Sequence, residues 1–216
     1  MTALTDPKLA QVLDREHDAA RAQWAARAKA GAGSAPRQAP PDFRSSERMK
    51  TSYLAIRPDQ GRFLYGQVLA TGARRIVEFG SSFGISTLYL AAAAQETGGH
   101  VTGTEYHPEK AAKARGNLSE AGLSADILVG DARETLSGGE GEIDLLFLDG
   151  AKDLYLPVLR LLEPRLRKSA VVIADNIPTD PARHGDFMAA ISEPASGYAT
   201  CVLGMSKGGM SHSVRL

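Results

Sequence analysis

The chain has 216 residues and a formal net charge of zero, with 25 basic and 25 acidic residues. This length suits one α/β domain with its own core, and the balanced charge gives no support for a nucleic-acid or membrane-surface partner. No apolar stretch approaches the roughly 20 residues that span a bilayer, and the first residues lack the basic and apolar regions of a secretory signal. We therefore expect a cytoplasmic protein with neither a nucleic-acid nor a membrane partner.

The first 48 residues predict a helical extension followed by a connection. The Ala-rich segment from Asp6 to Ala30 has the spacing of a helix, and Asp6 can cap its N-terminus. Gly31 to Pro41 is rich in Gly, Ala and Pro, which predicts a flexible connection. A homodimer is a further expectation, because Trp24 lies on this extension. Residues 49–216 are then expected to form the main domain.

Helices and strands alternate in the main domain. Pro58 to Ala70 predicts a helix that ends at Gly72. Further helices are predicted at 85–94 and 108–121, and strands at 75–79, 101–105, 127–129 and in the runs that stop at Asp149 and Asp175. The order βαβαβ favours an α/β fold with a doubly wound, mostly parallel sheet.

The C-terminal part predicts a hairpin. Residues 198–203 and 210–216 are strand-like, and the link between them, 204–209, is short and rich in glycine. At least one of the final strands should therefore be antiparallel. The single cysteine, Cys201, excludes an intramolecular disulfide, and its apolar surroundings favour a small buried side chain.

Two apolar runs that stop at a carboxylate predict a metal site. The first run ends at Asp149, and the second ends at Asp175 followed by Asn176. Neighbouring strands lie roughly 4.8 Å apart, and ligands bind beyond their carboxyl ends in open α/β sheets. Two carboxylates and an amide oxygen are ligands that suit magnesium, manganese or calcium. Lys152, one helical turn past Asp149, could reach the same volume. For either run alone, a helix N-cap is the alternative.

Acidic residues after the first three strands predict a nucleoside pocket. Gly80 follows the first strand, but Ser82 stands in the middle of Gly80-x-x-x-Gly84, which differs from the dinucleotide pattern G-x-G-x-x-G. Glu105 follows about 25 residues later, where an acid accepts hydrogen bonds from a ribose. Asp131 is placed to accept from an exocyclic amine such as that of adenine. A solvated strand end and a helix cap are the alternatives for these two acids; together the residues outline an adenosine.

These motifs resemble those of the class I S-adenosylmethionine-dependent methyltransferases. Within that class the chain is similar to the metal-dependent O-methyltransferases of the catechol and caffeoyl-CoA type. The resemblance covers about residues 49–216 and rests on the segments 78–84, 149–157 and 174–176. It implies a Rossmann-like, seven-stranded methyltransferase fold with an added antiparallel strand. S-adenosylmethionine is the implied cofactor, together with a divalent metal, Mg²⁺ foremost and Mn²⁺ or Ca²⁺ as alternatives.

The resemblance also implies a role for individual residues. Asp149, Asp175 and Asn176 match the metal ligands, and Lys152 matches the catalytic base, so that Lys152 and Asp149 are the predicted catalytic residues. The predicted cofactor contacts are Glu78, Gly80, Ser82 and Ser86 at the methionine end, Glu105 at the ribose, Asp131 and Ala132 at the adenine, and Asp149.

The chain departs from the family pattern at two places, which leaves the acceptor open. Ala151 stands where many relatives carry a bulky aromatic residue, and the segment 204–212 lacks the carboxylate that mammalian-type catechol enzymes carry near this hairpin. The expected acceptor is thus a small phenolic or catechol-like molecule with a hydroxyl group, without catechol itself being implied. Two alternatives remain: a nicotinamide-dependent oxidoreductase on a similar sheet, and a non-catalytic module that binds S-adenosylmethionine.

Overall fold

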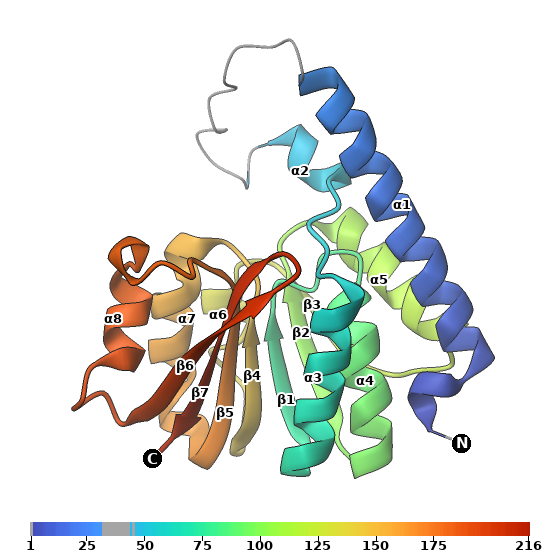
Figure 1. Ribbon diagram of the computed structural model, residues 1–216. Coiled ribbons are helices and arrows are strands. Elements are labelled where there is room, and N and C mark those ends of the chain that lie inside the picture. The colour runs from blue at the N-terminus through green and yellow to red at the C-terminus, as the bar shows by residue number, and fades with distance from the viewer. Residues whose placement is uncertain (1, 32–43, 45) are drawn as a thin grey trace.

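A seven-stranded sheet organises the protein, and the computed structural model describes residues 2–31, 44 and 46–216 (Figure 1). The strand order is β3-β2-β1-β4-β5-β7-β6, and β7 is antiparallel to both of its neighbours. The strands are β1 (Arg75–Phe79), β2 (His100–Glu105), β3 (Asp126–Val129), β4 (Ile143–Leu148), β5 (Leu166–Ile177), β6 (Tyr198–Met205) and β7 (Gly208–Arg215). This topology confirms the predicted mostly parallel, Rossmann-like sheet with a C-terminal hairpin.

Helices cover both faces of the sheet (Figure 1). One layer contains α1 (Pro7–Gly31), α3 (Pro58–Thr71), α4 (Ile85–Thr97) and α5 (Pro108–Glu120), with the short α2 (Glu47–Thr51) near its top. The other layer contains α6 (Ala132–Thr135), α7 (Tyr155–Leu162) and α8 (Asp186–Ser192). The described helices include none that is both long and apolar enough to cross a membrane. Most of the predicted connection, residues 32–41, lies outside the described residues.

The strands bury side chains on both faces, because alternate residues point in opposite directions. In β4, Leu145 and Phe147 join the core under α3 and α4, whereas Leu146 and Leu148 join the core under α7 and α8. All four side chains are fully buried. This burial on both faces explains why the run before Asp149 is continuously apolar, and it fixes the strand that positions Asp149.

The N-terminal helix packs on the same core as the sheet. Leu9, Val12 and Ala20 of α1 are buried against α4 and α5. Trp24, on which the expectation of a homodimer rests, donates from Nε1 to the carbonyl of Tyr53 at 3.0 Å and lies under the guanidinium of Arg57. These contacts within the chain engage Trp24, so it gives a homodimer no support, and the homodimer stays a prediction.

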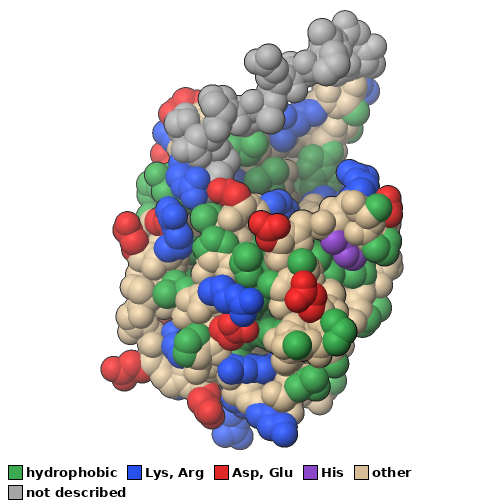
Figure 2. All heavy atoms as spheres, turned by 90° about the vertical axis from the view of Figure 1, so that its left-hand side faces the viewer, with side chains coloured by type: hydrophobic (Ala, Val, Ile, Leu, Met, Phe, Trp, Pro, Cys, Tyr) green, Lys and Arg blue, Asp and Glu red, His purple; other side chains and the backbone are tan. Residues whose placement is uncertain are grey.

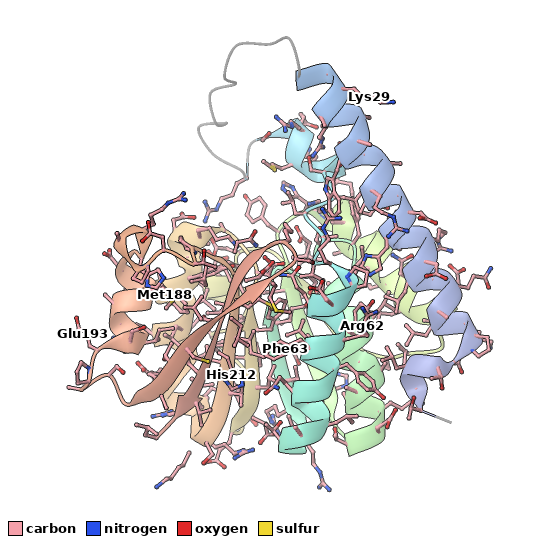
Figure 3. The ribbon with its side chains drawn as sticks, in the orientation of Figure 1. Lys29, Arg62, Phe63, Met188, Glu193 and His212 are labelled. Carbon is pink, nitrogen blue, oxygen red and sulfur yellow. The ribbon has the colours of Figure 1, made fainter. Side chains whose placement is uncertain are left out.

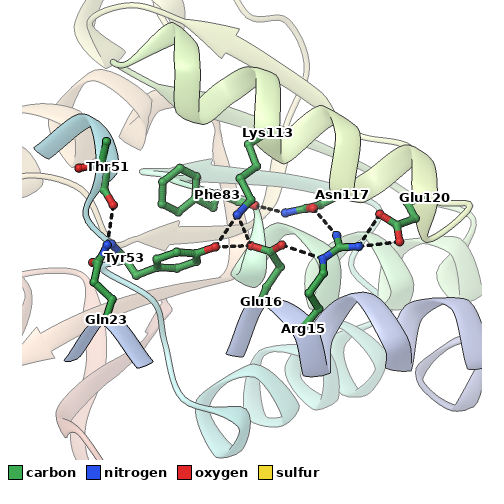
Figure 4. A network of polar contacts seen from close by, with 9 residues as sticks. All are labelled: Arg15, Glu16, Gln23, Thr51, Tyr53, Phe83, Lys113, Asn117 and Glu120. Atoms are coloured by element: carbon green, nitrogen blue, oxygen red, sulfur yellow. Dashed lines mark hydrogen bonds and ion pairs between the residues drawn. The ribbon is translucent and has the colours of Figure 1, made fainter. Parts of the chain in front are cut away.

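A buried carboxylate joins α1 to α5 (Figure 4). Glu16 accepts from the hydroxyl of Tyr53 at 2.8 Å, lies 2.9 Å from Nζ of Lys113 and accepts from Nε of Arg15 at 3.1 Å. Burial alone would raise the pKa of Glu16, but these hydrogen bonds outweigh it and lower the pKa. The network holds the segment that begins at Tyr53 against the rest of the fold.

Glu16→Gln is expected to lower the free energy of unfolding at neutral pH by about 1–3 kcal/mol, because it removes a buried charge partner of Lys113. A lowered native pKa means that this stabilisation is complete above the ordinary pKa of 4.5 and is lost as the pH falls through the native value. Urea unfolding at pH 7 and near pH 3 checks both points. The gap between wild type and variant should shrink in acid, and a gap that stays constant would contradict the prediction.

The C-terminal hairpin packs beside α3. His212 of β7 lies next to Phe63 of α3, with ring centroids 6.1 Å apart, and its Nε2 is 2.8 Å from Oε1 of Gln67 (Figure 3). The strands extend to Met205 and Gly208, so the link between them is shorter than predicted.

Cys201 is exposed, which corrects the prediction of a buried side chain. The physical reason is that β6 is the outer strand of the sheet and has a neighbouring strand on one side only. Figure 2 shows hydrophobic, basic and acidic side chains interspersed on the face that lies to the left in Figure 1.

Candidate active site

Two adjoining pockets lie at the carboxyl ends of the central strands. Gly80, Ser82 and Asp149 line both of them. Glu105, Asp131 and Ala132 line the first pocket, and Ser86 lines the second. The structure therefore brings together all of the predicted cofactor contacts except Glu78. This is the place where ligands bind in open α/β sheets.

Glu105 lies at the end of β2 and is held by backbone groups. Its Oε2 accepts from the backbone N–H of Ser82 and its Oε1 from that of His107, both at 2.8 Å. Each carboxylate oxygen can accept a further hydrogen bond. A fixed carboxylate that lines a pocket can therefore still accept from a pair of vicinal hydroxyls, as the predicted ribose contact requires.

Asp131 caps a helix and also lines the first pocket. It caps α6 by accepting from the backbone N–H of Arg133 at 2.9 Å, and it also accepts from Nη2 of that side chain at 2.7 Å. These bonds lower the pKa of Asp131 to about 2, with Arg133 as the main cause. The carboxylate lines the first pocket beside Ala132. The helix-cap alternative is therefore correct, and contact with adenine stays a prediction.

Glu78 lies beneath the loop that follows β1 and does not line either pocket. It accepts from the hydroxyl of Ser81 at 2.7 Å and from that of Thr87 at 2.5 Å, and its full burial raises its pKa. Its other oxygen, Oε1, is buried without a hydrogen-bond partner among the described residues. In this structure Glu78 supports the loop, so its predicted contact with the methionine end stays a prediction.

Gly80 makes close contact with the loop after β4. Its φ is +98°, and a Cβ atom there would lie 2.7 Å from the backbone N of Gly150 and 2.8 Å from the carbonyl of Asp149. Glycine is therefore required for the approach of two strand ends, as well as for the approach of a ligand. The sequence suggested only the second reason.

Gly80→Ala is expected to lower the free energy of unfolding by about 2 kcal/mol or more, because the new methyl group meets backbone in a strained conformation. Gly66→Ala is the matched control, since Gly66 lies in α3 and a Cβ there meets nothing within 4 Å. That control should be neutral or stabilising by about 0.5–1 kcal/mol. Urea unfolding compares the two variants, and equal stability would contradict the argument.

Asp149, Asp175 and Asn176 form one cluster, because β4 and β5 are neighbours. Nδ2 of Asn176 lies 3.0 Å from Oδ1 of Asp149 and 2.9 Å from Oδ2 of Asp175. Burial raises the pKa of both carboxyl groups.

The sequence placed Asp175 at the end of its strand, but β5 continues to Ile177. An irregularity between Ala174 and Ile177, with Asn176 at φ +58°, interrupts the ladder, and such bulges re-aim side chains.

Lys152 reaches the cluster, as predicted. Its Nζ lies 3.4 Å from Oδ1 of Asp149 and donates to the hydroxyl of Tyr155. Burial lowers the pKa of Lys152, whereas the carboxylates of Asp149 and Asp175 act in the opposite direction. Lys152 also lines a groove that runs from Asn176 toward Phe187 and Met188. An amine here can exchange a proton with a molecule bound between the groove and the cluster.

Sequence reasoning missed two residues that hold the cluster. Gln60 is fully buried at the start of α3, and its Nε2 donates to Oδ1 of Asp175 at 2.6 Å. Tyr155 donates to the backbone carbonyl of Asp175 at 3.1 Å. The only signal for Gln60 was its position three residues after Arg57, because its Oε1 accepts from the backbone N–H of that residue in a capping box. Nothing local indicates its second partner.

Comparison with known proteins finds methyltransferases. Residues 77–177 match the profile of a family described as a methyltransferase domain. The chain is 35% identical over 136 residues to a catechol O-methyltransferase of Mycobacterium tuberculosis, covering 62% of this chain and 61% of that one. It is 29% identical over 133 residues to a catechol O-methyltransferase of Niastella koreensis, covering 59% and 60%. The chain thus spans about three fifths of the length of these curated relatives.

Solved structures of methyltransferases share the fold. An O-methyltransferase from Bacillus cereus in complex with S-adenosylhomocysteine superposes with a TM-score of 0.64 and 25% identity, over 75% of this chain and 83% of that one. The O-methyltransferase TomG of Streptomyces achromogenes superposes with a TM-score of 0.68 over 97% and 90%, at 23% identity. The fold is that of methyltransferase domains, and residues 77–177 are similar to that family. The resemblance to S-adenosylmethionine-dependent O-methyltransferases of the catechol and caffeoyl-CoA type is confirmed.

Proposed function

We propose that the protein is a divalent-metal-dependent O-methyltransferase that transfers the methyl group of S-adenosylmethionine to a hydroxyl of a small phenolic or catechol-like acceptor. The observation that carries this proposal is the double position of Asp149. This residue lines both cofactor pockets and also belongs to the cluster with Asp175 and Asn176. A methyl donor in the pockets and a hydroxyl at the cluster would therefore meet at Asp149.

The residues present fit S-adenosylmethionine. Glu105 offers free acceptor capacity to a ribose, and Asp131 borders the same pocket. Near the second pocket, the unpartnered Oε1 of Glu78 is an acceptor that an ammonium group could satisfy, and a buried unpaired acceptor costs free energy. When bound, S-adenosylmethionine supplies an activated methyl group on its sulfonium. The names of the relatives and the bound ligands of the solved structures support this cofactor.

The cluster fits a hard divalent cation. No described group of three or more His, Cys, Asp or Glu side chains is placed to hold a metal, so the donor set would be two carboxylates and the amide of Asn176. Amide oxygen and nitrogen are assigned from the hydrogen-bond network, and a turned amide would direct three oxygens to one point. Such a set suits Mg²⁺, with Mn²⁺ or Ca²⁺ as alternatives. A bound cation would favour the ionised form of an acceptor hydroxyl.

The chain's own residues then supply positioning and proton transfer. Gln60 and Tyr155 hold Asp175 in place, which keeps the spacing between the two carboxylates fixed. Nζ of Lys152 takes the proton from the acceptor hydroxyl, and a phenol needs such a base because its pKa lies near 10. Fixing the hydroxyl in line with the methyl group lowers the entropic part of the barrier.

Calorimetric titration with S-adenosylhomocysteine and with NAD, followed by methyl-transfer assays with Mg²⁺ or a chelator, tests the proposal. We expect binding of S-adenosylhomocysteine, no binding of NAD, and transfer that depends on the metal. The relatives and structures named above are all methyltransferases and give the oxidoreductase alternative no support. Preference for NAD would overturn the proposal, and binding without transfer would favour the non-catalytic module. A cytoplasmic location and the absence of nucleic-acid and membrane partners stay predictions.

A further inference from the structure

The tip of the β6–β7 hairpin is fixed against the start of α3. Ser206 donates from its backbone N–H to Oδ2 of Asp59 at 3.1 Å and from its hydroxyl to Oδ1 at 2.7 Å. The next residue, Lys207, donates from Nζ to the carbonyl of Ala55 at 3.3 Å. A hairpin tip held by three hydrogen bonds presents its side chains in a defined place. Lys207 is partly exposed and therefore open to a ligand.

The ammonium group of Lys207 stands beside the candidate active site. Its charge acts on Asp149, on Asp175 and on Lys152. Its partner Ala55 lines the second pocket together with Asp149. Neither Asp175 nor Lys152 lines these two pockets, so the charge of Lys207 acts on residues outside the pockets as well as on Asp149.

The charges around the cluster favour an anionic acceptor. A divalent cation would balance the two carboxylates of Asp149 and Asp175. Because Lys152 is the proposed base, Lys207 then remains as the cation beside the cluster. Arg183 lines the groove that Lys152 and Asn176 share, and the acids Asp153 and Asp186 line it too. The hairpin carries no acid between residues 204 and 212 that could offset Lys207 or accept a hydrogen bond from a second hydroxyl. A cation that has no acid beside it on its own hairpin favours a ligand group of the opposite charge.

We propose that Lys207 determines acceptor specificity by pairing with a carboxylate group of the acceptor, which makes the preferred acceptor a hydroxylated aromatic acid. This inference rests on the proposed function, because it places the acceptor hydroxyl at the Asp149–Asp175 cluster. Lys207 acts in recognition and takes no proton in the transfer.

The test compares 3,4-dihydroxybenzoate with 3,4-dihydroxybenzyl alcohol, which share a ring and differ in charge. Binding of each is measured by calorimetry to the full chain with Mg²⁺ and S-adenosylhomocysteine present, and kcat and KM are measured with S-adenosylmethionine. The wild type should bind the acid about tenfold more tightly, as expected for a hydrogen bond to a charged group. Lys207→Gln should remove most of that preference through KM, while binding of the alcohol and of S-adenosylhomocysteine changes less than about twofold.

Lys168→Gln is the matched control, because Lys168 is an exposed lysine in the first part of β5, before the strand reaches the site. It makes the same change in net charge and should leave the preference intact. Asp59→Asn and Ser206→Ala each weaken the hydrogen bonds that fix the hairpin tip, and they keep the charge of Lys207. Both variants should weaken the preference for the acid over the alcohol. An intermediate loss in these variants would support the role of the fixed hairpin.

Three outcomes would overturn the inference. The first is equal binding of acid and alcohol by the wild type, and the second is failure of the acid to bind. The third is weaker binding of S-adenosylhomocysteine by Lys207→Gln, which would assign Lys207 to the carboxylate of the cofactor. Methylation of neither acceptor by a protein that binds both would contradict the proposed function, and the binding preference would still decide the role of Lys207.

Discussion

Asp175→Asn is expected to reduce methyl transfer by more than about a hundredfold, because it removes one of two negative ligands from the proposed metal site. Asparagine has nearly the shape of aspartate, and its side-chain oxygen can still accept the hydrogen bond that Gln60 donates at 2.6 Å. The fold should therefore survive, whereas alanine would leave Gln60 buried without a partner. Initial rates with Mg²⁺ and calorimetric titration with Mn²⁺ measure the effect on turnover and on metal affinity separately.

Asp126→Asn is the control for this substitution. Asp126 begins β3, and its side chain is 68% exposed and pairs with His100. The same chemical change there should leave metal affinity and turnover within about twofold of the wild type, as for most surface substitutions. Full activity of Asp175→Asn in the presence of a chelator would remove the metal from the mechanism and with it the assigned role of the cluster.

The sheet and the convergence of Asp149 with Asp175 could be predicted because both depend on local patterns. Apolar runs of strand length identify strands buried on both faces, and parallel neighbours bring their carboxyl ends to one edge. The bounds predicted for the first strand, 75–79, are those of β1. A carboxylate after such a run therefore has a predictable place, even though the sequence does not state which strands are neighbours.

Long-range contacts and departures from ideal strands could not be predicted. Gln60 contacts Asp175 across 115 positions of the chain, and its local capping role conceals that second contact. Glu78 sits in the same loop motif as Gly80, but its side chain turns under the loop because alternate strand residues face opposite ways. The extension of β5 past Asp175 depends on pairing with β7, which arrives more than 30 residues later.

Tertiary contacts also decided which cations face the site. Lys152 could be placed from its distance to Asp149 along the chain. Lys207 gave no such signal, because its position depends on the hydrogen bonds between Ser206 and Asp59. The hairpin itself was predictable from its glycine-rich link. The direction of the hairpin over α3 could not be predicted, and that direction brings the ammonium group of Lys207 toward Asp149.

Lys152→Met is expected to lower kcat by about 10²–10⁴-fold for an ordinary phenolic acceptor, because it removes the group proposed to take the hydroxyl proton. Methionine is one atom shorter than lysine but keeps an unbranched apolar side chain beside the ring of Tyr155. Binding of S-adenosylhomocysteine should change little, since Lys152 does not line the two pockets proposed to hold the cofactor. Rates across pH and calorimetric titration of the cofactor product measure the two effects.

An acidic acceptor separates proton removal from positioning. The hydroxyl of 4-nitrocatechol ionises far more readily than that of a simple catechol, so its transfer depends less on a base. If Lys152 acts by taking the proton, Lys152→Met should lose much less activity with 4-nitrocatechol than with 4-methylcatechol, which lacks the electron-withdrawing group. An equal loss with both acceptors would assign Lys152 to positioning through Asp149 and Tyr155, and unchanged turnover across pH would remove it from the mechanism altogether.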